Sequence, residues 1–441
     1  TQSDGGTKNS DFKRRRAYYT GSYTSRYADL VWQAGLSSQD YGASTFYSAK
    51  FDNQWEVTRR IITSAQADIK PFGDERLVIT PQAYWHRDVD HYQLTRGKEG
   101  AKNGENYHRT DVYGASLNAH ATWLLGKTAV GMDIRKEHIL STAYGDLLPE
   151  NEWKDIHGTD RRYDHRGDRT NTSLFLEHNV ILGGFTLSAG VLANRNTGLD
   201  GDFRFYPGVD LSYRPNEMWK FYASWNKALR VPTYTDLYTS NSVQQGDTGL
   251  RPERTSTFKA GTRFRTRGVE AVVSGFYSKG NDIIDWVYET EESRKYHAMN
   301  IGKLDNMGYS VDATLNMTEL LPGSFVTRIK AGYARIHQRH TTEQPVYRSL
   351  YALEYLRHKA TFQLDHRIWS RLSASWAVRW QERMNHYEPY TKVDCKLQWT
   401  APTYSLYVKA DNITNHRYYD LGGVRQPGLW IMAGGSVKIG L

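Results

Sequence analysis

The sequence predicts an all-β fold, a transmembrane antiparallel β-barrel with short turns at one end and long loops at the other. Three observations predict it: an aromatic-rich but hydrophilic composition, a hydrophobic period of two residues, and connections that alternate in length. A chain that crosses a bilayer with tilted strands, faces lipid with every second side chain and wets its lumen has these properties.

The composition separates this chain from an ordinary soluble enzyme of its length. Aromatic residues make up 13% of the 441 residues, with 31 Tyr and 13 Trp, while the mean hydropathy is −0.69. A barrel explains both values, because it buries few residues on both sides and places aromatic girdles at two membrane interfaces. No stretch approaches the roughly 20 consecutive apolar residues of a membrane helix, as expected when strands cross the bilayer.

Charge, cysteine content and side-chain chemistry argue against other functional classes. The net charge is +9, but Arg and Lys are scattered without a compact basic motif, so we expect no nucleic-acid partner. Cys395 is the only cysteine, so no intrachain disulfide can form. Nothing singles out a nucleophile with a base and an orienting partner. We therefore expect no catalytic residues and no enzyme; outer-membrane proteases and lipases, the enzymatic alternative, use smaller barrels.

The hydrophobic period along the chain is two residues rather than 3.6. In 113–123 the odd positions are apolar or aromatic, from Tyr113 through Leu117 to Trp123, and the even positions are Gly, Ser, Asn, His and Thr. The same alternation occurs in 309–317 and 391–399. Further stripes lie at 59–69, 77–85, 203–213, 219–227, 325–333, 362–368, 372–380 and 404–410. Each strand therefore has one apolar and one polar face.

The predicted connections alternate between short and long, an asymmetry typical of outer-membrane barrels. The short ones are 25–29, 71–75, 124–127, 182–184, 214–217, 266–268, 319–324, 369–371 and 401–403. The mostly long, polar ones are about 39–58, 88–108, 140–170, 194–203, 229–254, 280–300, 336–358, 383–389 and 412–428. A soluble β-sandwich is the alternative, but its loops need not alternate and strands of about 9 to 15 residues are long for it.

The strand count predicts that strands are missing from this chain. Stripes and turns give about 19 strands, from one near 12–24 to one over about 429–441. These two would point the same way, whereas a closed single-chain bacterial barrel has an even number of antiparallel strands. Residues 1–10 read as part of an outer loop. We therefore expect that the N-terminal part of the complete protein precedes this chain.

Aromatic residues in the predicted outer loops are the best ligand-binding candidates. A flat, partly polar ligand could stack on such rings and hydrogen-bond to their hydroxyl groups; the alternative is that the rings form the outer girdle or pack loop against loop. The candidates are Tyr41, Phe46, Tyr47 and Trp55 in one predicted loop and Tyr144, Tyr234 and Tyr238 in others.

Two other clusters suggest a metal only weakly, and we predict no metal site. His337, His340 and His358 could suggest haem or a metal, but residues three apart on a strand do not share a face. The cluster 88–91 contains two Asp residues, whereas Ca²⁺ needs about six to eight oxygen ligands. Solvated loop side chains are the alternative for both.

Several stretches resemble the barrel of TonB-dependent outer-membrane receptors. Residues 229–261 are similar to the family's Arg-x-Pro-(Ser/Thr) step followed by Leu-x-Pro-Glu, with matches at Arg230, Pro232, Thr233, Leu250, Pro252 and Glu253. Residues 410–420 resemble the Asn-Leu-x-Asn-x-x-Tyr segment, and 423–441 resemble the closing strand. The departures are Leu429, where the family usually has Arg, and a final Leu441 in place of the common Phe.

The resemblance implies a barrel of about 22 strands with a plugged lumen, of which 1–441 would be the C-terminal portion without its plug. It also implies a bacterial outer-membrane protein that transports actively, by mechanical gating. The implied partners are outer-membrane lipid, the protein's own plug domain and TonB of the inner-membrane energising complex.

The ligand follows from finer resemblance. Residues 107–145, 47–60 and 351–366 look like the cobalamin (vitamin B12) receptor branch found in Bacteroidetes-like bacteria. We therefore expect a corrinoid as the transported ligand, no resident cofactor, and a surface lipoprotein lid as a further partner of that branch. A ferric siderophore or haem receptor of the same family is the alternative, and a passive porin or structural barrel is the second alternative.

Overall fold

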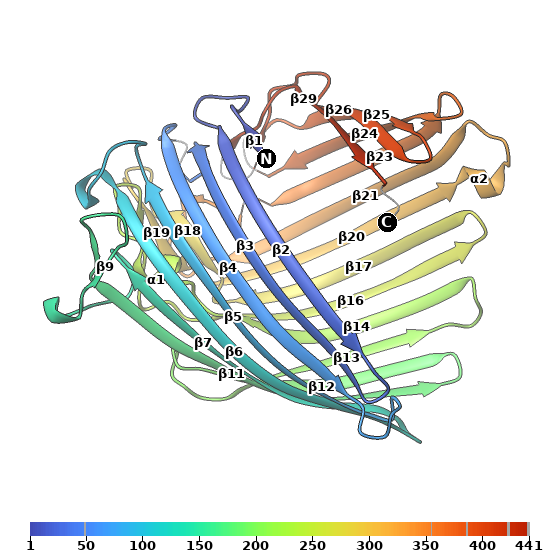
Figure 1. Ribbon diagram of the computed structural model, residues 1–441, viewed down its shortest axis with the longest axis horizontal. Helices are drawn as coiled ribbons and strands as arrows, with labels where there is room; N and C mark the ends of the chain where they lie inside the picture. The colour runs from blue at the N-terminus through green and yellow to red at the C-terminus, as the bar shows by residue number, and fades with distance from the viewer. Residues whose placement is uncertain (48–49, 354, 385–386, 421–423, 439–441) are drawn as a thin grey trace.

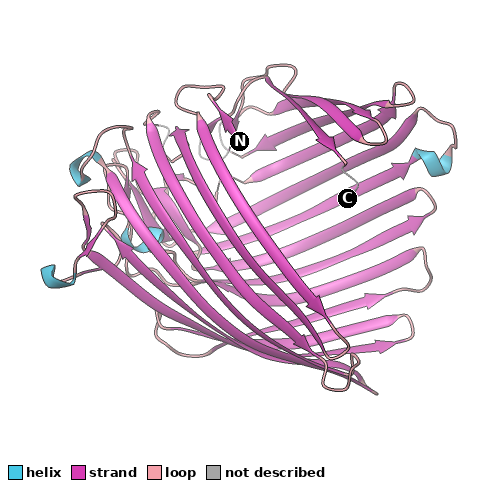
Figure 2. Ribbon diagram, in the orientation of Figure 1, coloured by secondary structure: helices cyan, strands magenta, loops and turns pink. Residues whose placement is uncertain are grey.

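The computed structural model describes all residues except 48–49, 354, 385–386, 421–423 and 439–441. Most of the described chain forms one large, curved antiparallel sheet (Figure 1). Figure 2 shows that helix is confined to short segments between strands. No helix in the described part is long and apolar enough to cross a membrane.

Nineteen long strands make up this sheet in the described part of the chain, and two strands of two residues, β1 (Gln2–Ser3) and β8 (Asp146–Leu147), are attached to it. The long strands are β2 (Phe12–Thr24), β3 (Ala28–Ser44), β4 (Gln54–Ile69), β5 (Leu77–Gln93), β6 (Glu105–Trp123), β7 (Gly126–Ser141), β11 (His165–Leu182), β12 (Phe185–Asn196), β13 (Arg204–Tyr213), β14 (Trp219–Arg230), β16 (Glu253–Thr266), β17 (Val269–Asn281), β20 (Lys303–Asn316), β21 (Val326–Thr341), β23 (Leu356–Arg367), β24 (Leu372–Arg383), β25 (Tyr390–Thr400), β26 (Tyr404–Asp411) and β29 (Trp430–Val437).

Each long strand pairs with the next one along the chain, and every one of these pairs is antiparallel. This meander confirms the predicted all-β fold and the strand count. At the two ends of the sheet, β29 pairs only with β26, and β2 pairs with β3 and the two-residue β1 in the described residues. The predicted last strand extended to residue 441, and the final three residues of that strand lie outside the described part of the chain.

The two faces of the sheet follow the predicted alternation. On β6 the odd side chains from Tyr113 to Trp123 are apolar or aromatic, and the large ones are exposed, with Leu117 57% and Trp123 50% exposed. Register keeps this face continuous across strands, since Ala115 lies opposite Ala83 of β5 and Ile134 of β7. This is the outward, lipid-type face. The opposite stripe, which includes Ser116, is the inward face.

The short turns lie where the sequence predicted them, with one exception. They join consecutive strands at one end, seen at the right and lower right of Figure 1, while the long loops gather at the other end. The exception is the turn predicted at 319–324. Here β20 ends at Asn316 and the short helix α2 (Met317–Leu320) begins the connection.

Several of the long loops are shorter than the sequence predicted, because the strands continue into them. β3 runs to Ser44 and β4 begins at Gln54, so Tyr41 and Trp55 lie on strands rather than in a loop. β6 has 19 residues, whereas a tilted strand needs about 9 to 11 to cross a membrane. The prediction was wrong here because both faces of a strand are polar once it leaves the hydrocarbon, so the two-residue stripe no longer marks it.

Three long loops build a second sheet of their own, which the sequence did not predict. It has the order β15 (Gln244–Gln245), β19 (Tyr296–Asn300), β18 (Ile284–Tyr288) and β22 (Arg348–Ser349). Its strands come from the connections β14–β16, β17–β20 and β21–β23. We call this sheet the loop cap. Figure 1 places β18 and β19 at the long-loop end of the molecule.

The loop cap contains two of the three apolar cores found among the described residues. In one core, Trp286 and Ala298 pack with Leu250 and Ile284. Val287 belongs to the second core. Val287 is fully buried. Burial of this kind, absent from most of the two-faced main sheet, holds the three loops together as one unit.

Candidate functional site

The candidate ligand site lies on the inward face at the long-loop end, which we call the mouth. Register brings its residues together. Glu56 of β4 lies opposite Tyr41 of β3 and Tyr92 of β5, and Asp90 of β5 lies opposite His108 of β6. All are more than ten residues from the short turns and so lie above the span that crosses the hydrocarbon.

The first half of the mouth is a ring of tyrosines around one carboxylate. The hydroxyl groups of Tyr41 and Tyr47 both donate to Glu56 Oε2, and their oxygens are 3.1 Å apart. The Tyr47 ring meets the Tyr92 ring edge-on at 5.4 Å and the Phe46 ring at 4.9 Å. Glu56 is 7% exposed, so this buried carboxylate fixes the direction of both hydroxyl groups.

The second half is built around Tyr144 and the short helix α1 (Tyr234–Tyr238). The Tyr144 ring stacks on His108 at 4.2 Å, and its hydroxyl group lies 3.1 Å from Thr239 Oγ1. Within α1, the rings of Tyr234 and Tyr238 are 6.2 Å apart. The Tyr234 hydroxyl group is buried and has no hydrogen-bond partner among the described residues, so a polar group of a ligand could bind it.

The motif residues singled out in the sequence hold α1 against the barrel wall. Thr233 caps the helix, accepting from the Asp236 N–H. Arg230 pairs with Asp236 at 3.2 Å and with Glu253 at 2.7 Å. The guanidinium of Arg169 donates to the Pro232 carbonyl at 2.8 Å and lies 4.7 Å from the Tyr234 ring centroid.

Burial changes the protonation of the acids and bases in the mouth. Burial, together with the neighbouring Glu56 carboxylate, raises the pKa of Asp90 to about 8. Burial lowers the pKa of His108 to about 4. At neutral pH, His108 is therefore uncharged and Asp90 is largely protonated, and the mouth offers hydrogen-bonding groups with little charge.

The structure groups the predicted ligand residues unequally. Tyr41, Phe46 and Tyr47 form one cluster, and Tyr144, Tyr234 and Tyr238 form the other. Trp55 lies on the opposite face of β4 from Glu56, where its Nε1 donates to Asp40 at 2.7 Å and its ring meets His91. For all seven predicted residues, contact with a ligand stays a prediction.

Sequence reasoning missed four residues that join the two clusters: Glu56, Asp90, Tyr92 and His108. Asp90 entered the sequence argument only as a weak calcium candidate. The signal that identifies the set is strand register, because all four are even-numbered and inward-facing on adjacent strands. The sequence could not predict the register of these strands beyond the point where the two-residue alternation ends.

The histidine and carboxylate clusters considered for a metal do not converge. His337 and His358 are outward-facing, while His340 of β21 faces the other side. Likewise His91 lies on the opposite face of β5 from Asp90. Among the described residues, no group of three or more His, Cys, Asp or Glu side chains could hold a metal ion.

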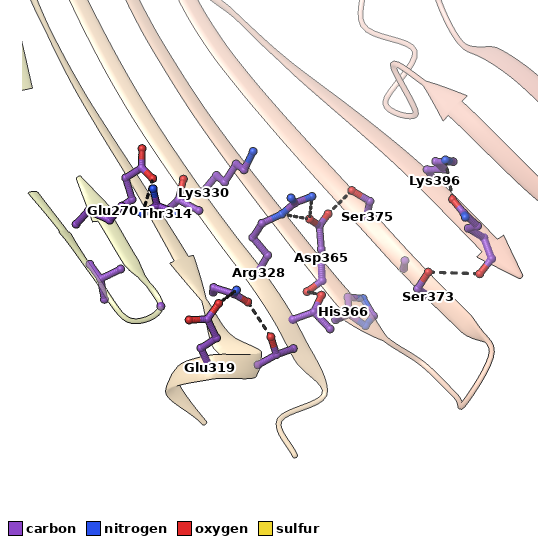
Figure 3. A pocket seen from close by; sticks show the side chains of 18 of the residues that line it. Glu270, Thr314, Glu319, Arg328, Lys330, Asp365, His366, Ser373, Ser375 and Lys396 are labelled. Atoms are coloured by element: carbon purple, nitrogen blue, oxygen red, sulfur yellow. Dashed lines mark hydrogen bonds and ion pairs between the residues drawn. The ribbon is translucent and has the colours of Figure 1, made fainter. Parts of the chain in front are cut away.

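A second polar cavity lies on the inward face at the short-turn end. Its volume is about 870 Å³. Figure 3 shows Arg328 and Ser375 both directed at Asp365; the guanidinium of Arg328 lies 2.6 Å from that carboxylate. Lys330 and Lys396 also line it. This end of the wall is therefore polar and already largely paired.

Comparisons with known proteins agree with this architecture. A family model described as "TonB dependent receptor-like, beta-barrel" matches residues 1–413. The iron transporter FrpB of Neisseria meningitidis, in its apoprotein form, has a TM-score of 0.75 at 16% identity, covering 97% of this chain and 71% of that chain. The copper transporter OprC has a TM-score of 0.76 at 16% identity, with 98% and 74% covered.

The ferric citrate transporter FecA in its unliganded form has a TM-score of 0.72 at 14% identity, with 97% of this chain and 70% of that chain covered. At such identities the likeness shows the shared fold alone. The iron, copper and ferric citrate named for these proteins are statements about those proteins.

Proposed function

The chain belongs to the TonB-dependent receptor family of outer-membrane β-barrels, and on that premise we propose that it forms the wall and mouth of an active-transport receptor for a corrinoid. The protein lies in the bacterial outer membrane, as the family does, with short turns on the periplasmic side and long loops outside. The family consists of receptors and transporters rather than enzymes.

The observation that carries the corrinoid proposal is that the corrinoid-like runs of sequence build the mouth. Residues 47–60 supply Tyr47 and Glu56, and residues 107–145 supply His108 and Tyr144. These runs are far apart in the chain but meet through β4, β5 and β6. Two of the three runs therefore contribute side chains to the surface where a ligand would bind.

The chemistry of the mouth supports a large ligand with little net charge. Its inward groups are tyrosine rings and hydroxyls, the neutral His108, and the acidic pair of Glu56 and Asp90. A corrinoid presents a broad ring system fringed with amides, which can stack on the tyrosines and hydrogen-bond to their hydroxyl groups. A strongly anionic ferric chelate would meet a carboxylate here and would need unpaired cations.

Energised gating is the second part of the proposal. A plug domain inside the barrel would face the polar wall around Asp365, and TonB would pull on that plug to open a path. The two unpaired edges, on β2 and β29, support further strands in the complete barrel, since unpaired backbone groups are costly in lipid. A surface lipoprotein lid over the loops is part of the same proposal.

The alternative ligand within the family is a ferric siderophore or haem. The solved structures of iron transporters resemble this chain only in fold, and the three candidate histidines do not face one another. Membership of the family favours active transport over a passive porin, the second alternative.

Calorimetry on the full-length protein in detergent tests the ligand. We expect cyanocobalamin to bind, and the double change Tyr47→Ala and Tyr144→Ala to weaken binding by at least about tenfold, since each ring contributes roughly 1 kcal/mol of stacking. The matched control is Tyr113→Ala, which removes an exposed outward tyrosine of the same barrel. Binding of a ferric siderophore without binding of cyanocobalamin would show that the ligand proposal is wrong.

A further inference from the structure

The short helix α1 reaches back across the inward face of the sheet. It lies in the connection that follows β14, yet Arg169 of β11 and Tyr144, which follows β7, both contact α1 or its flanking residues. β12 and β13 lie between β11 and β14 in the sheet. Three steps between neighbouring strands span about 14 Å, so α1 crosses the lumen-facing side of two strands to meet the residues that hold it.

This helix is too short to keep its own place. It has five residues, from Tyr234 to Tyr238, whereas isolated helices shorter than about 12 residues are marginal in water. The capping box between Thr233 and Asp236 closes one turn only. Contacts with the wall must therefore decide where the two tyrosine rings of α1 lie.

Arg169 joins α1 to the wall. Its Nε donates to Glu137 of β7, and its Nη1 donates to the Pro232 carbonyl oxygen at 2.8 Å. Its guanidinium carbon lies 4.7 Å from the centroid of the Tyr234 ring, within the range of a cation–π interaction. One guanidinium group thus connects the wall, the backbone before α1 and the first ring of α1.

The backbone next to Arg169 completes a seat for the Tyr234 ring. Gly167 and Arg169 both face inward on β11. A Cβ atom on Gly167 would lie 2.6 Å from Cε1 of Tyr234, so the ring packs directly against this glycine and a larger residue would displace it. A glycine and an arginine, two positions apart on one face of β11, therefore fix the ring together.

Arg169 is largely covered by its own partners. Its side chain is 16% exposed, and Glu137, Pro232 and Tyr234 occupy its polar atoms and its face. Arg135 of β7 pairs with the other oxygen of the same carboxylate at 2.9 Å and is 42% exposed. Among the described residues, Arg135 makes no hydrogen bond or ion pair with α1. The two arginines thus share an anion but differ in their link to the helix.

We propose that Arg169 is a positioning residue of the ligand site, which holds α1 across the wall so that Tyr234 and Tyr238 lie in the mouth. The inference rests on the proposed function, in which these two tyrosines contact the ligand. Because Arg169 is covered, it acts on the ligand through the two rings and not by direct contact.

Calorimetry with cyanocobalamin and hydrogen exchange in α1, both on the full-length protein in detergent, test this proposal. Arg169→Met removes all three contacts of the guanidinium group. The matched control is Arg135→Met, which removes the neighbouring guanidinium group from the same Glu137 carboxylate. Each change is also made in a background without the two rings, Tyr234→Ala with Tyr238→Ala. A heat-dependent gel shift verifies that every variant is folded.

Arg169→Met should weaken cyanocobalamin binding by about tenfold and speed exchange in α1 by roughly tenfold or more, while Arg135→Met should change neither. In the background without the two rings, Arg169→Met should weaken binding no further, because a residue that acts through those rings has nothing left to position. A general loss of barrel stability would lower the affinity in both backgrounds.

Equal affinity of folded Arg169→Met and wild type overturns the proposal, and so does an equally large loss in Arg135→Met. A further loss in the background without the two rings overturns it as well. A wild type that does not bind cyanocobalamin contradicts the proposed function instead. Hydrogen exchange then decides the inference: faster exchange in α1 for Arg169→Met but not for Arg135→Met supports it, and unchanged exchange overturns it.

Discussion

At the scale of single residues, a buried carboxyl group controls the charge of the mouth. Asp90 lies between Thr58 and His108 in the sheet, with Glu56 close enough to disfavour its ionisation. One proton on this pair removes a negative charge from a surface made largely of tyrosine rings and hydroxyl groups. If the Glu56 and Asp90 carboxylates were both ionised, they would repel each other across β4 and β5.

Asp90 should make the stability of the protein depend on pH. Its pKa is raised from 3.8 to about 8 in the folded state, so the folded state loses stability as pH rises from about 4 through about 8, while the unfolded chain ionises freely. We expect the thermal unfolding midpoint of the full-length protein in detergent, followed by tryptophan fluorescence, to fall by roughly a few degrees over this range.

The change Asp90→Asn should flatten this profile, because an amide resembles the protonated acid and cannot ionise. Asp160→Asn, at an exposed loop position, is the control and should follow the wild type. A slope that persists unchanged in Asp90→Asn would assign the pH dependence to another group.

At the scale of elements, loops that are long in sequence form a compact structure. The loop cap joins three connections, and its central residue is Asp285, 1% exposed. Asp285 accepts from the backbone N–H groups of Trp286 and Ala352 at 2.8 and 2.9 Å and from the Ser349 hydroxyl group. This carboxylate links β18 to the β21–β23 connection. Lys50 donates to the Tyr288 hydroxyl at 3.1 Å, so the cap also contacts the loop that carries Tyr47.

Asp285→Ala should loosen all three loops together. The change leaves buried N–H groups without an acceptor, which costs about 3 kcal/mol, so hydrogen-exchange protection should fall roughly a hundredfold in the cap. Exchange in β15, β18 and β22, one strand from each of the three loops, measured by mass spectrometry on the full-length protein, provides the test. Glu291→Ala, exposed in the same loop, is the control. Faster exchange in only one of the three loops would show that the cap is not one unit.

At the scale of the whole molecule, the open edges of the sheet decide whether it can exist alone in lipid. Both β2 and β29 have a side without a long partner strand in the described residues. In a bilayer, each unsatisfied backbone group costs several kcal/mol. A closed barrel removes this cost, and the proposed additional strands would provide the closure.

A polypeptide limited to residues 1–441 should therefore fail to form a stable barrel. Refolded into detergent, it should show no heat-dependent gel shift, while the full-length protein refolded in parallel should show one. A gel shift for residues 1–441 alone, with monomer mass by light scattering, would mean that β2 and β29 can close on each other.

The sequence alone determined the fold class, the number of long strands and the sidedness of the barrel. These properties repeat along the chain: a stripe such as Tyr113 to Trp123 reports lipid on one side and water on the other, and each short turn marks one end. The physical cause is local, since the bilayer imposes the same two-residue pattern on every strand that crosses it.

Only the tertiary structure decided which residues form the mouth and the loop cap. Above the membrane, both faces of a strand meet water, so no stripe showed that Trp55 faces away from Glu56 or that Asp90 lies beside His108. Residues of the loop cap come from connections separated by tens of positions, and their meeting depends on register. Pairing across strands, rather than any local preference of the chain, fixes that register.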